Sequence, residues 1–445
     1  MSTSLYTSIR SNLQTLYLED ERPWLVGFSG GKDSSMVASL IFEVVLGLPP
    51  EKRIKPIAVL CTDTRVEIPA IVEMVETTLA KMRKCSISNN LNIEVHLLRP
   101  PAEQSFWVNV IGRGYPPPNR VFRWCTSRLK INPMSSFVEK WIGRWGEAIF
   151  HLGARRAESS SRAQTMAARE TRNGLRRHND LPRVWISNPI EHLSTEEVWA
   201  YLLQNKPSWG GSNRELYKLY ADASGGECPI QIEANAPSCG NSRFGCWTCT
   251  VVDKDKASEG LLASGDERME QLIQFRDVLI NIRNPDNGYR DTRRMNGDEG
   301  NGPLIMKGRR ELLTRLLRLQ DETGLTLISE EELLLIQKFW NSAREPDSGD
   351  GVARIVREQR GIMTSDIKQA DQIRALEEQV CREKGISHEG LRRLISKVEE
   401  HSESHRRFGL PDDLLRILQD ELESSTRLTE AIEVEVEFVG VGELV

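Results

Sequence analysis

Six residues near the start of the chain, Ser-Gly-Gly-Lys-Asp-Ser at positions 29–34, have the composition of a phosphate-binding loop. Gly30 and Gly31 let the backbone approach a ligand closely, and Lys32 adds a positive charge. The apolar run before the loop predicts a buried strand, and the spacing after Ser35 predicts a helix. The loop would therefore open at a helix N-terminus with unpaired N–H groups, a combination that favours a polyanion.

The common nucleotide loop, Gly-x4-Gly-Lys-Ser/Thr, does not fit this stretch. Val26 stands where its first glycine should be, and Asp33 follows the lysine where a magnesium-binding hydroxyl should be. The stretch resembles instead the pyrophosphate loop of the ATP pyrophosphatases, which cleave ATP to AMP and pyrophosphate. That resemblance implies that the β- and γ-phosphates of ATP are bound by Ser29, Gly30, Gly31, Lys32, Asp33 and Ser34. An ordinary glycine-containing turn is the alternative.

Four of the eight cysteines lie close together in the sequence, with the spacing Cys-x10-Cys-x6-Cys-x2-Cys. They are Cys228, Cys239, Cys246 and Cys249. Four thiolates on one glycine-containing loop can bind tetrahedral zinc or a [4Fe–4S] cluster. Zinc ribbons usually pair two Cys-x-x-Cys knuckles, and only one is present, which favours iron–sulfur. Four cysteines without a metal are the alternative.

Cys125 lies in a basic stretch, with Arg120, Arg123, Arg128 and Lys130 nearby and no acidic residue between them. Such surroundings predict a lowered thiol pKa, and hence a thiolate that attacks or carries a persulfide. The alternative is a half-buried cysteine in a loop that faces nucleic acid.

Composition is typical of a globular protein, with 39% hydrophobic and 28% charged residues among 445. No apolar run approaches the ~20 residues that span a bilayer, and the first residues lack the apolar core of a signal peptide. We therefore expect an intracellular, cytoplasmic protein. The formal net charge of -5 argues against a uniformly basic nucleic-acid binder, so such contacts would use local patches.

Apolar runs alternate with helical spacing over the first half, which predicts an α/β fold with a parallel sheet flanked by helices. Strands are expected at 24–28, 55–64 and 92–100, within 146–162 together with an exit loop, and at 182–190, and helices at 35–45, 68–84 and 194–204. Ser194 is the expected N-cap of the last helix. Three prolines at 116–118 predict an irregular loop after the third strand rather than another crossover helix.

The rest of the chain changes character twice. Residues 207–252 are rich in glycine and cysteine and poor in periodicity, whereas the pattern from 257 onward is helical and ends in an alternating tail that predicts an edge strand. We expect three domains: an ATP pyrophosphatase domain at 1–206, a cysteine-rich iron–sulfur segment at 207–256 and a helical domain at 257–445.

Four motifs together resemble one family. "FSGGKDSS", "VLCTDTRVEIP", "RWCTSRLKI" and "GARRAESSSR" are similar to motifs of the phosphoadenylylsulfate reductase-like ATP pyrophosphatases. Within it, "FGCWTCTVVDKDKA" and the cysteine spacing resemble the DndC family, the sulfur-incorporating subunits of bacterial DNA phosphorothioation systems. The resemblance implies an adenine nucleotide α-hydrolase-like fold.

The resemblance also implies a reaction: ATP adenylylates a DNA backbone phosphate, and sulfur then displaces AMP. Lys32 would offset charge as pyrophosphate leaves. Asp63, after the second strand, would hold Mg²⁺ or only cap a turn. Arg155 would contact the nucleotide or the activated phosphate, and Glu158 would position that loop. The implied partners are DNA, a cysteine desulfurase and the other Dnd subunits, an ATPase and a small DNA-binding protein.

A basic run offers a surface for nucleic acid. Residues 155–183 contain eight arginines against three acidic residues, in a chain that is acidic overall. A solvated loop is the alternative. Phe122 and Trp124 would either stack on a base or be buried.

Three other functions fit parts of the sequence. A sulfonucleotide reductase shares the fold but needs a reducing cysteine on its C-terminal tail, and the last sixteen residues contain none. A tRNA thiolase usually has an early Cys-x-x-Cys, which is absent. A non-catalytic ATP-binding scaffold would not need the loop lysine and both loop serines, which are intact.

Overall fold

The structure is a computed structural model, and it describes most of the chain. The described residues are 2–158, 160–167, 174–223, 245–252, 254–342, 351–360, 376–377, 379–387, 390–391, 393–395, 397–398, 411 and 413–420. The chain divides into two compact units, Met1–Ile355 and Val356–Val445, each of which is considered by itself. The domain boundaries expected at 206 and 256 stay predictions, and the expected tail strand lies outside the described residues.

A six-stranded sheet forms the centre of the first unit, with the order β3-β2-β1-β4-β6-β5. Five strands are parallel: β1 (Trp24–Gly27), β2 (Ile57–Thr62), β3 (Ile93–Leu98), β4 (Ala148–His151) and β6 (Val184–Ser187). The two-residue β5 (Arg176–Arg177) pairs antiparallel with β6 at the edge. The predicted parallel α/β sheet is confirmed; β5 was too short to be found by periodicity.

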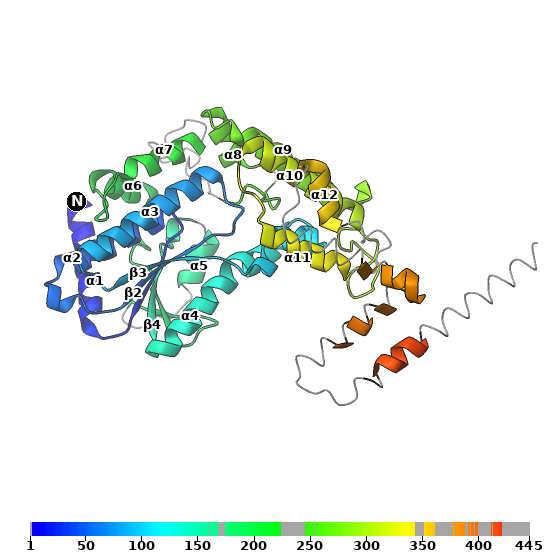
Figure 1. The fold of residues 1–445 in the computed structure, drawn as a ribbon. Coiled ribbons are helices and arrows are strands. Elements are labelled where there is room, and N and C mark those ends of the chain that lie inside the picture. The colour runs from blue at the N-terminus through cyan, green and yellow to red at the C-terminus, as the bar shows by residue number, and fades with distance from the viewer. Residues whose placement is uncertain are drawn as a thin grey trace, which may run out of the picture. The chain divides into compact units, whose positions relative to one another are not determined.

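Helices cover both faces of the sheet. Figure 1 shows α2 (Lys32–Gly47) and α3 (Pro69–Ser88) on one side and α4 (Asn132–Trp145) on the other. Val138 and Trp141 of α4 pack with strand residues such as Leu25 and Phe150 in one core cluster. Because both faces are covered, the central strands are apolar throughout rather than alternating.

The expectation of an irregular loop in place of a crossover helix after the third strand is wrong. The prolines at 116–118 do lie in irregular chain, but α4 follows and forms the crossover to β4. Proline disrupts helix only locally, and the apolar spacing of α4 resumes beyond it. Also unpredicted are α1 (Ser2–Glu19) and α7 (Asn213–Ala223), the latter inside the stretch expected to lack periodicity.

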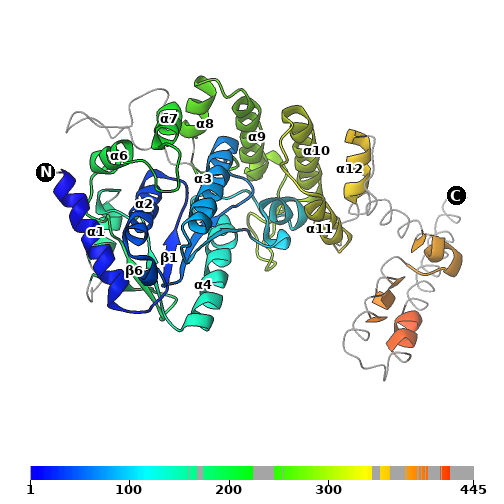
Figure 2. The same cartoon turned by 60° about the vertical axis from the view of Figure 1, so that its left-hand side comes forward.

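The helical pattern predicted from 257 onward is confirmed by five helices, while the helices expected around 365–384, 388–401 and 411–423 lie largely outside the described residues. The five helices are α8 (Lys256–Ala263), α9 (Arg268–Arg283), α10 (Met306–Thr323), α11 (Glu330–Asn341) and α12 (Gly351–Arg360). Figure 2 shows α9 and α10 side by side. The N-cap of α6 (Thr195–Gln204) is Ser194, as predicted. Shorter elements are α5 (Ser160–Ala167), the 3-10 helices η1 (Pro50–Lys52), η2 (Ala102–Gln104), η5 (Arg156–Glu158) and η6 (Pro285–Asn287), and the π-helices η3 (Val108–Gly112) and η4 (Thr126–Ile131).

Candidate active site

The loop between β1 and α2 requires glycine at its tip. Gly30 has φ of +75°, and a Cβ atom there would lie 2.4 Å from Cγ2 of Val75. Gly31 is the N-cap of α2 and offers no side chain to the first helical amides. The loop therefore presents backbone at a helix N-terminus, as a phosphate-binding loop must.

Two serine hydroxyls close this loop on itself. The Ser29 N–H donates to Oγ of Ser34 at 3.2 Å, and that hydroxyl lies 3.0 Å from the Gly31 carbonyl oxygen, to which it donates. The loop is thereby held in one conformation before any ligand binds, which lowers the entropy cost of binding.

Asp33 lies between two cations. The Lys32 Nζ is 3.2 Å from Oδ2 of Asp33, and the Arg155 Nε is 2.6 Å from Oδ1. Arg155 is only 2% exposed, and its other guanidinium nitrogens donate to the Leu193 carbonyl and the Thr195 hydroxyl. These contacts give Arg155 a positioning role toward the loop; its expected contact with the nucleotide stays a prediction.

The segment that carries Arg155 is itself fastened to the loop. The Arg155 N–H donates to Oε1 of Glu158 at 3.1 Å, and the positioning role expected for Glu158 stays a prediction. A Cβ atom on Gly153 would lie 2.8 Å from the Asp33 carbonyl carbon. The two motifs, more than a hundred residues apart, therefore pack backbone against backbone.

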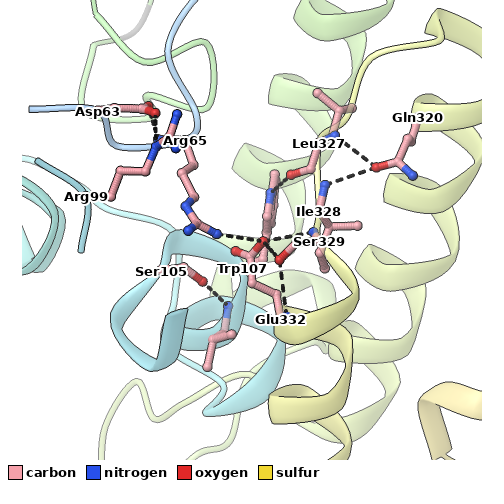
Figure 3. A network of polar contacts seen from close by, with 11 residues as sticks. Asp63, Arg65, Arg99, Ser105, Trp107, Gln320, Leu327, Ile328, Ser329 and Glu332 are labelled. Atoms are coloured by element: carbon pink, nitrogen blue, oxygen red, sulfur yellow. Dashed lines mark hydrogen bonds and ion pairs between the residues drawn. The ribbon is translucent and has the colours of Figure 1, made fainter. Parts of the chain in front are cut away.

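Asp63 follows β2 at the same edge of the sheet, and Figure 3 shows its partners. Its Oδ1 accepts from the Arg65 N–H at 2.7 Å, and its Oδ2 accepts from Nε of Arg99 at 2.8 Å. Arg65 has φ of 62°, so this carboxylate stabilises an uncommon backbone conformation. Turn capping, one of the two roles considered, is thus observed, and the binding of Mg²⁺ stays a prediction.

Beside Asp63 lies a cleft of about 530 Å³, whose lining includes Arg65, Trp247 and Ser329. Its far wall, residues 325–329, is fixed by Gln320, whose Oε1 accepts from the N–H groups of Leu327 and Ile328 (Figure 3). Sequence reasoning missed this wall. The spacing of Ser329 and Glu332 is typical of a capping box and could be found in the sequence. The ion pair between Arg65 Nη1 and Glu332 Oε2, at 3.9 Å, could not.

The cysteine-rich segment pairs with the stretch of chain that follows Asp63, outside the sheet. Cys246 forms an antiparallel bridge with Glu67, and the Trp247 N–H donates to the Val66 carbonyl at 3.0 Å. The Sγ of Cys246 lies 3.4 Å from Oγ1 of Thr64. Cys246 therefore contacts Thr64, the residue that follows Asp63, the predicted magnesium ligand.

Cys125 is close enough to Cys249 for the two thiols to interact, a neighbourhood that the sequence did not predict. Burial raises the pKa of Cys125, the charge of Cys249 raises it further, and Lys130 opposes both. The expectation of a lowered pKa is wrong. The arginines of the stretch point elsewhere: Arg128 donates to Gln104 and Tyr115, and the side chain of Arg123 is exposed.

Lys130 is the cation that acts on this group of thiols. Its Nζ lies 3.6 Å from Oε1 of Glu67, and it lowers the pKa of Cys125 and Cys246. Burial nevertheless raises the pKa of Cys246 to about 11, so its thiol is protonated at neutral pH. Such thiols become ligands or nucleophiles only when additional positive charge offsets the burial.

The sequence profile of the phosphoadenosine phosphosulfate reductase domain family matches residues 23–252, more than half of the chain. The chain belongs to this family. A curated relative, an uncharacterised protein of Methanocaldococcus jannaschii, is 26% identical over 241 residues. The match covers 54% of the chain and 39% of that protein, so the chain spans well under half of its length.

Two solved structures are similar to the chain at low sequence identity. The phosphoadenylyl-sulfate reductase of Candida auris in complex with phosphate has 12% identity and a TM-score of 0.29, covering 44% of this chain and 79% of its own. The FMN adenylyltransferase of Candida glabrata with FAD and pyrophosphate has 12% identity and a TM-score of 0.28, covering 59% and 73%.

The phosphoadenosine phosphosulfate reductase domain family match includes all four cysteines proposed as metal ligands. Cys228 and Cys239 lie outside the described residues. Cys246 and Cys249 are free thiols, and the Cys249 backbone N–H donates to the Cys246 carbonyl at 2.9 Å. Within the described part of the chain, no three His, Cys, Asp or Glu side chains are arranged to hold a metal ion. The iron–sulfur centre and Mg²⁺ stay predictions.

The arginine-rich run in this family domain is partly committed to internal contacts. Arg156 and Arg176 pair with Glu191 at 3.1 and 2.7 Å. Burial alone would raise the pKa of the Glu191 carboxyl, but the two guanidiniums outweigh burial and hold this pKa below its ordinary value. Arg169 and Arg172 lie outside the described residues. The role of this run in DNA binding stays a prediction.

Across the described segments, no helix is both long and apolar enough to cross a membrane.

Proposed function

We propose that this chain is an ATP pyrophosphatase that transfers sulfur to a backbone phosphate of DNA, as in the DndC family. One observation carries the proposal: the nucleotide loop and a set of thiols share the carboxyl edge of the sheet. Asp63 and Thr64 are consecutive residues after β2, and Thr64 contacts Cys246. Open α/β sheets bind ligands at this edge, so activation by ATP and delivery of sulfur would occur side by side.

In the first step, a phosphate oxygen of DNA, which is a poor leaving group, is adenylylated so that it can leave. A phosphate oxygen of DNA attacks the α-phosphorus of ATP, the bond to the β-phosphate breaks, and pyrophosphate leaves. Lys32 and the amides at the start of α2 offset the negative charge that develops on pyrophosphate. Arg155 shares the Asp33 carboxylate with Lys32 by pairing with its opposite oxygen, so Asp33 neutralises Lys32 less than an exclusive ion pair would.

The second step exchanges the leaving group for sulfur. Sulfur at the oxidation level of sulfide attacks the phosphorus of the DNA phosphate, and AMP leaves with the oxygen that was adenylylated. A persulfide on Cys125, loaded by a cysteine desulfurase, is the proposed source. Its release as sulfide requires two electrons, which an external dithiol supplies. The half-buried setting of Cys125 protects the persulfide from water.

Two cofactors belong to the proposal. Asp63 would hold Mg²⁺, which would offset negative charge on the ATP phosphates, if its Oδ2 exchanged the Arg99 guanidinium for the ion. A [4Fe–4S] centre on Cys228, Cys239, Cys246 and Cys249 would supply thiolate-bound iron and sulfide. Anaerobically purified protein should then be brown and contain iron. A colourless protein with one zinc ion would contradict the iron–sulfur centre.

The decisive experiment uses the purified chain with ATP and a short DNA duplex under anaerobic, reducing conditions. We expect pyrophosphate release that depends on DNA and, with desulfurase and cysteine added, phosphorothioate detected by mass spectrometry after nuclease digestion. Sulfite release from phosphoadenylyl sulfate with a dithiol would instead favour the reductase, and pyrophosphate release without DNA would favour adenylylation of another acceptor.

A cysteine variant separates the sulfur routes. Cys125→Ser should eliminate phosphorothioate while ATP-dependent pyrophosphate release and iron content persist, because serine cannot carry transferable sulfur. Sulfur incorporation by this variant would exclude Cys125 as the carrier. Loss of iron from it would instead make Cys125 a ligand of the metal centre, as its proximity to Cys249 allows.

A further inference from the structure

Positive charge is concentrated in the segment 104–138, which contains five basic residues and no acidic residue. Arg113 donates to Asn109 and lies over the Phe339 ring, Arg128 donates to Tyr115, and Lys130 pairs with Glu67. Arg120 and Arg123 have side chains that are exposed to solvent, and Arg120 also has an interaction within the protein. They flank the tip of a loop.

The tip between these arginines is apolar and exposed. Val121 is 96% exposed and Phe122 is 43% exposed. The Asn119 Oδ1 accepts from the N–H groups of Val121 and Phe122, at 2.9 and 2.7 Å, so the turn is closed by its own first residue. Trp124 points the other way: it is 6% exposed, and its Nε1 donates to the Pro116 carbonyl.

The base of the loop is fixed to the cysteine-rich segment. The Pro118 carbonyl accepts from Oγ1 of Thr250 at 2.5 Å and from a guanidinium nitrogen of Arg283 at 2.8 Å. Thr250 follows Cys249 directly, and Cys125 lies two residues beyond Arg123. The tip therefore lies beside the thiols and is preorganised, which reduces the entropy cost of binding a partner.

We infer that the tip Arg120–Arg123 is a DNA-docking element that lays a backbone phosphate over the candidate active site. The two arginines contact flanking phosphates, and the apolar pair Val121 and Phe122 inserts against a base step. Interleaved arginine and exposed aromatic side chains fit a polyanion with flat apolar faces better than they fit an acidic protein surface. The choice of DNA as the occupant rests on the proposed function.

The test measures DNA binding alone, by fluorescence anisotropy of a labelled duplex at several salt concentrations, without ATP or a sulfur source. Phe122→Ala should weaken binding roughly tenfold or more. The double variant Arg120→Gln/Arg123→Gln should also lower the slope of log affinity against log salt by about 2, from two lost phosphate contacts. ATP affinity should be unchanged in both.

A matched control exists on another exposed stretch. Arg293→Gln/Met295→Ala removes an exposed arginine and a 78% exposed apolar side chain, but Asp291, Asp298 and Glu299 accompany them. This control should change DNA affinity less than twofold. Unchanged DNA binding by both tip variants would overturn the inference, as would stronger competition by tRNA than by DNA, or a loss confined to desulfurase binding.

The outcomes also separate this inference from the proposed function. Wild-type protein that binds duplex DNA through the tip, but releases no pyrophosphate and incorporates no sulfur, would retain the docking element and reject the reaction. Sulfur incorporation that is unaffected in both tip variants would retain the reaction and reject the docking element.

Discussion

The nucleotide loop and the thiol group lie at the same edge of the sheet but are built in opposite ways. The loop is six consecutive residues whose conformation is fixed mostly from within, by Gly30 and the paired hydroxyls of Ser29 and Ser34. The thiols come from Cys125, Cys246 and Cys249, which are brought together by the strand end at Thr64 and by the turn at Pro118. The conformation of the loop could be predicted from sequence because its contacts join neighbouring residues. The arrangement of the thiols could not, because their contacts join segments that are far apart in the chain.

Because the two regions are built differently, substitutions in the loop and in the sheet should have different effects. A substitution in the loop should remove one function while the fold survives, because its contacts are local. Substitutions beneath both regions should weaken them together, because both rest on the same sheet.

The largest expected effect separates the two regions directly. Lys32→Ala should reduce DNA-dependent pyrophosphate release at least ~100-fold, since it removes the cation that offsets charge on the leaving group. Iron content and the number of thiols titrated with a chromogenic disulfide should match wild type. Lys140→Ala, at an exposed lysine on α4, is the control and should retain full activity. Parallel loss of thiols and pyrophosphate release would mean that the regions are not separable.

The next test concerns the backbone of the loop. Gly30→Ala should destabilise the protein by about 3 kcal/mol, from strain at positive φ together with the clash against Val75. Gly324→Ala is matched in φ, at 67° against 75°, but meets nothing within 4 Å and should cost about 1 kcal/mol. Urea unfolding measures both. Equal losses would show that the contact with Val75 contributes nothing.

How far the sequence predicted the structure follows the same division. The apolar strand cores, the helical spacing of α2, α3 and α6 and the capping residue Ser194 depend on neighbours in the chain, and these were predicted correctly, whereas α1, α4 and α7 were missed. The pKa of Cys125 was predicted in the wrong direction because the charge on adjacent residues says nothing about where their side chains point. The cleft wall at 325–329 and the pairing of Arg155 with Asp33 depend on tertiary packing, which periodicity does not contain.

A pH-dependent weakening of the shared sheet should affect both regions at once. His151 on β4 is fully buried, and neither ring nitrogen has a hydrogen-bond partner among the described residues. Burial lowers its pKa to about 3 from the ordinary 6.5, with Lys55 adding to the effect. The unfolded chain therefore binds the extra proton first, so stability is complete above pH 6.5 and falls as the pH decreases toward 3.

Lowering the pH from 8 to 5 should reduce the free energy of unfolding by about 2 kcal/mol, because His151 becomes protonated in the unfolded chain but not in the folded protein. His151→Phe should remove that part of the pH dependence, because phenylalanine does not titrate. Urea unfolding of both proteins at the two pH values measures the difference. Identical pH dependence in wild type and variant would show that His151 is not buried as a neutral ring.

The smallest effects come from two capping boxes that serve the two regions separately. Ser194 caps α6 between Leu193 and Thr195, the two residues that bind Arg155, and Ser329 caps α11 beside the cleft. Replacing either serine by alanine should cost about 1 kcal/mol, because each loses a side-chain hydrogen bond to the helix amide three residues on. Their thermal stabilities should therefore fall by similar amounts. Only Ser194→Ala should weaken ATP binding in calorimetry, since only it loosens the support of Arg155 and hence of Asp33. Equal weakening of ATP binding by Ser329→Ala would mean that the cleft wall also contributes to the nucleotide site.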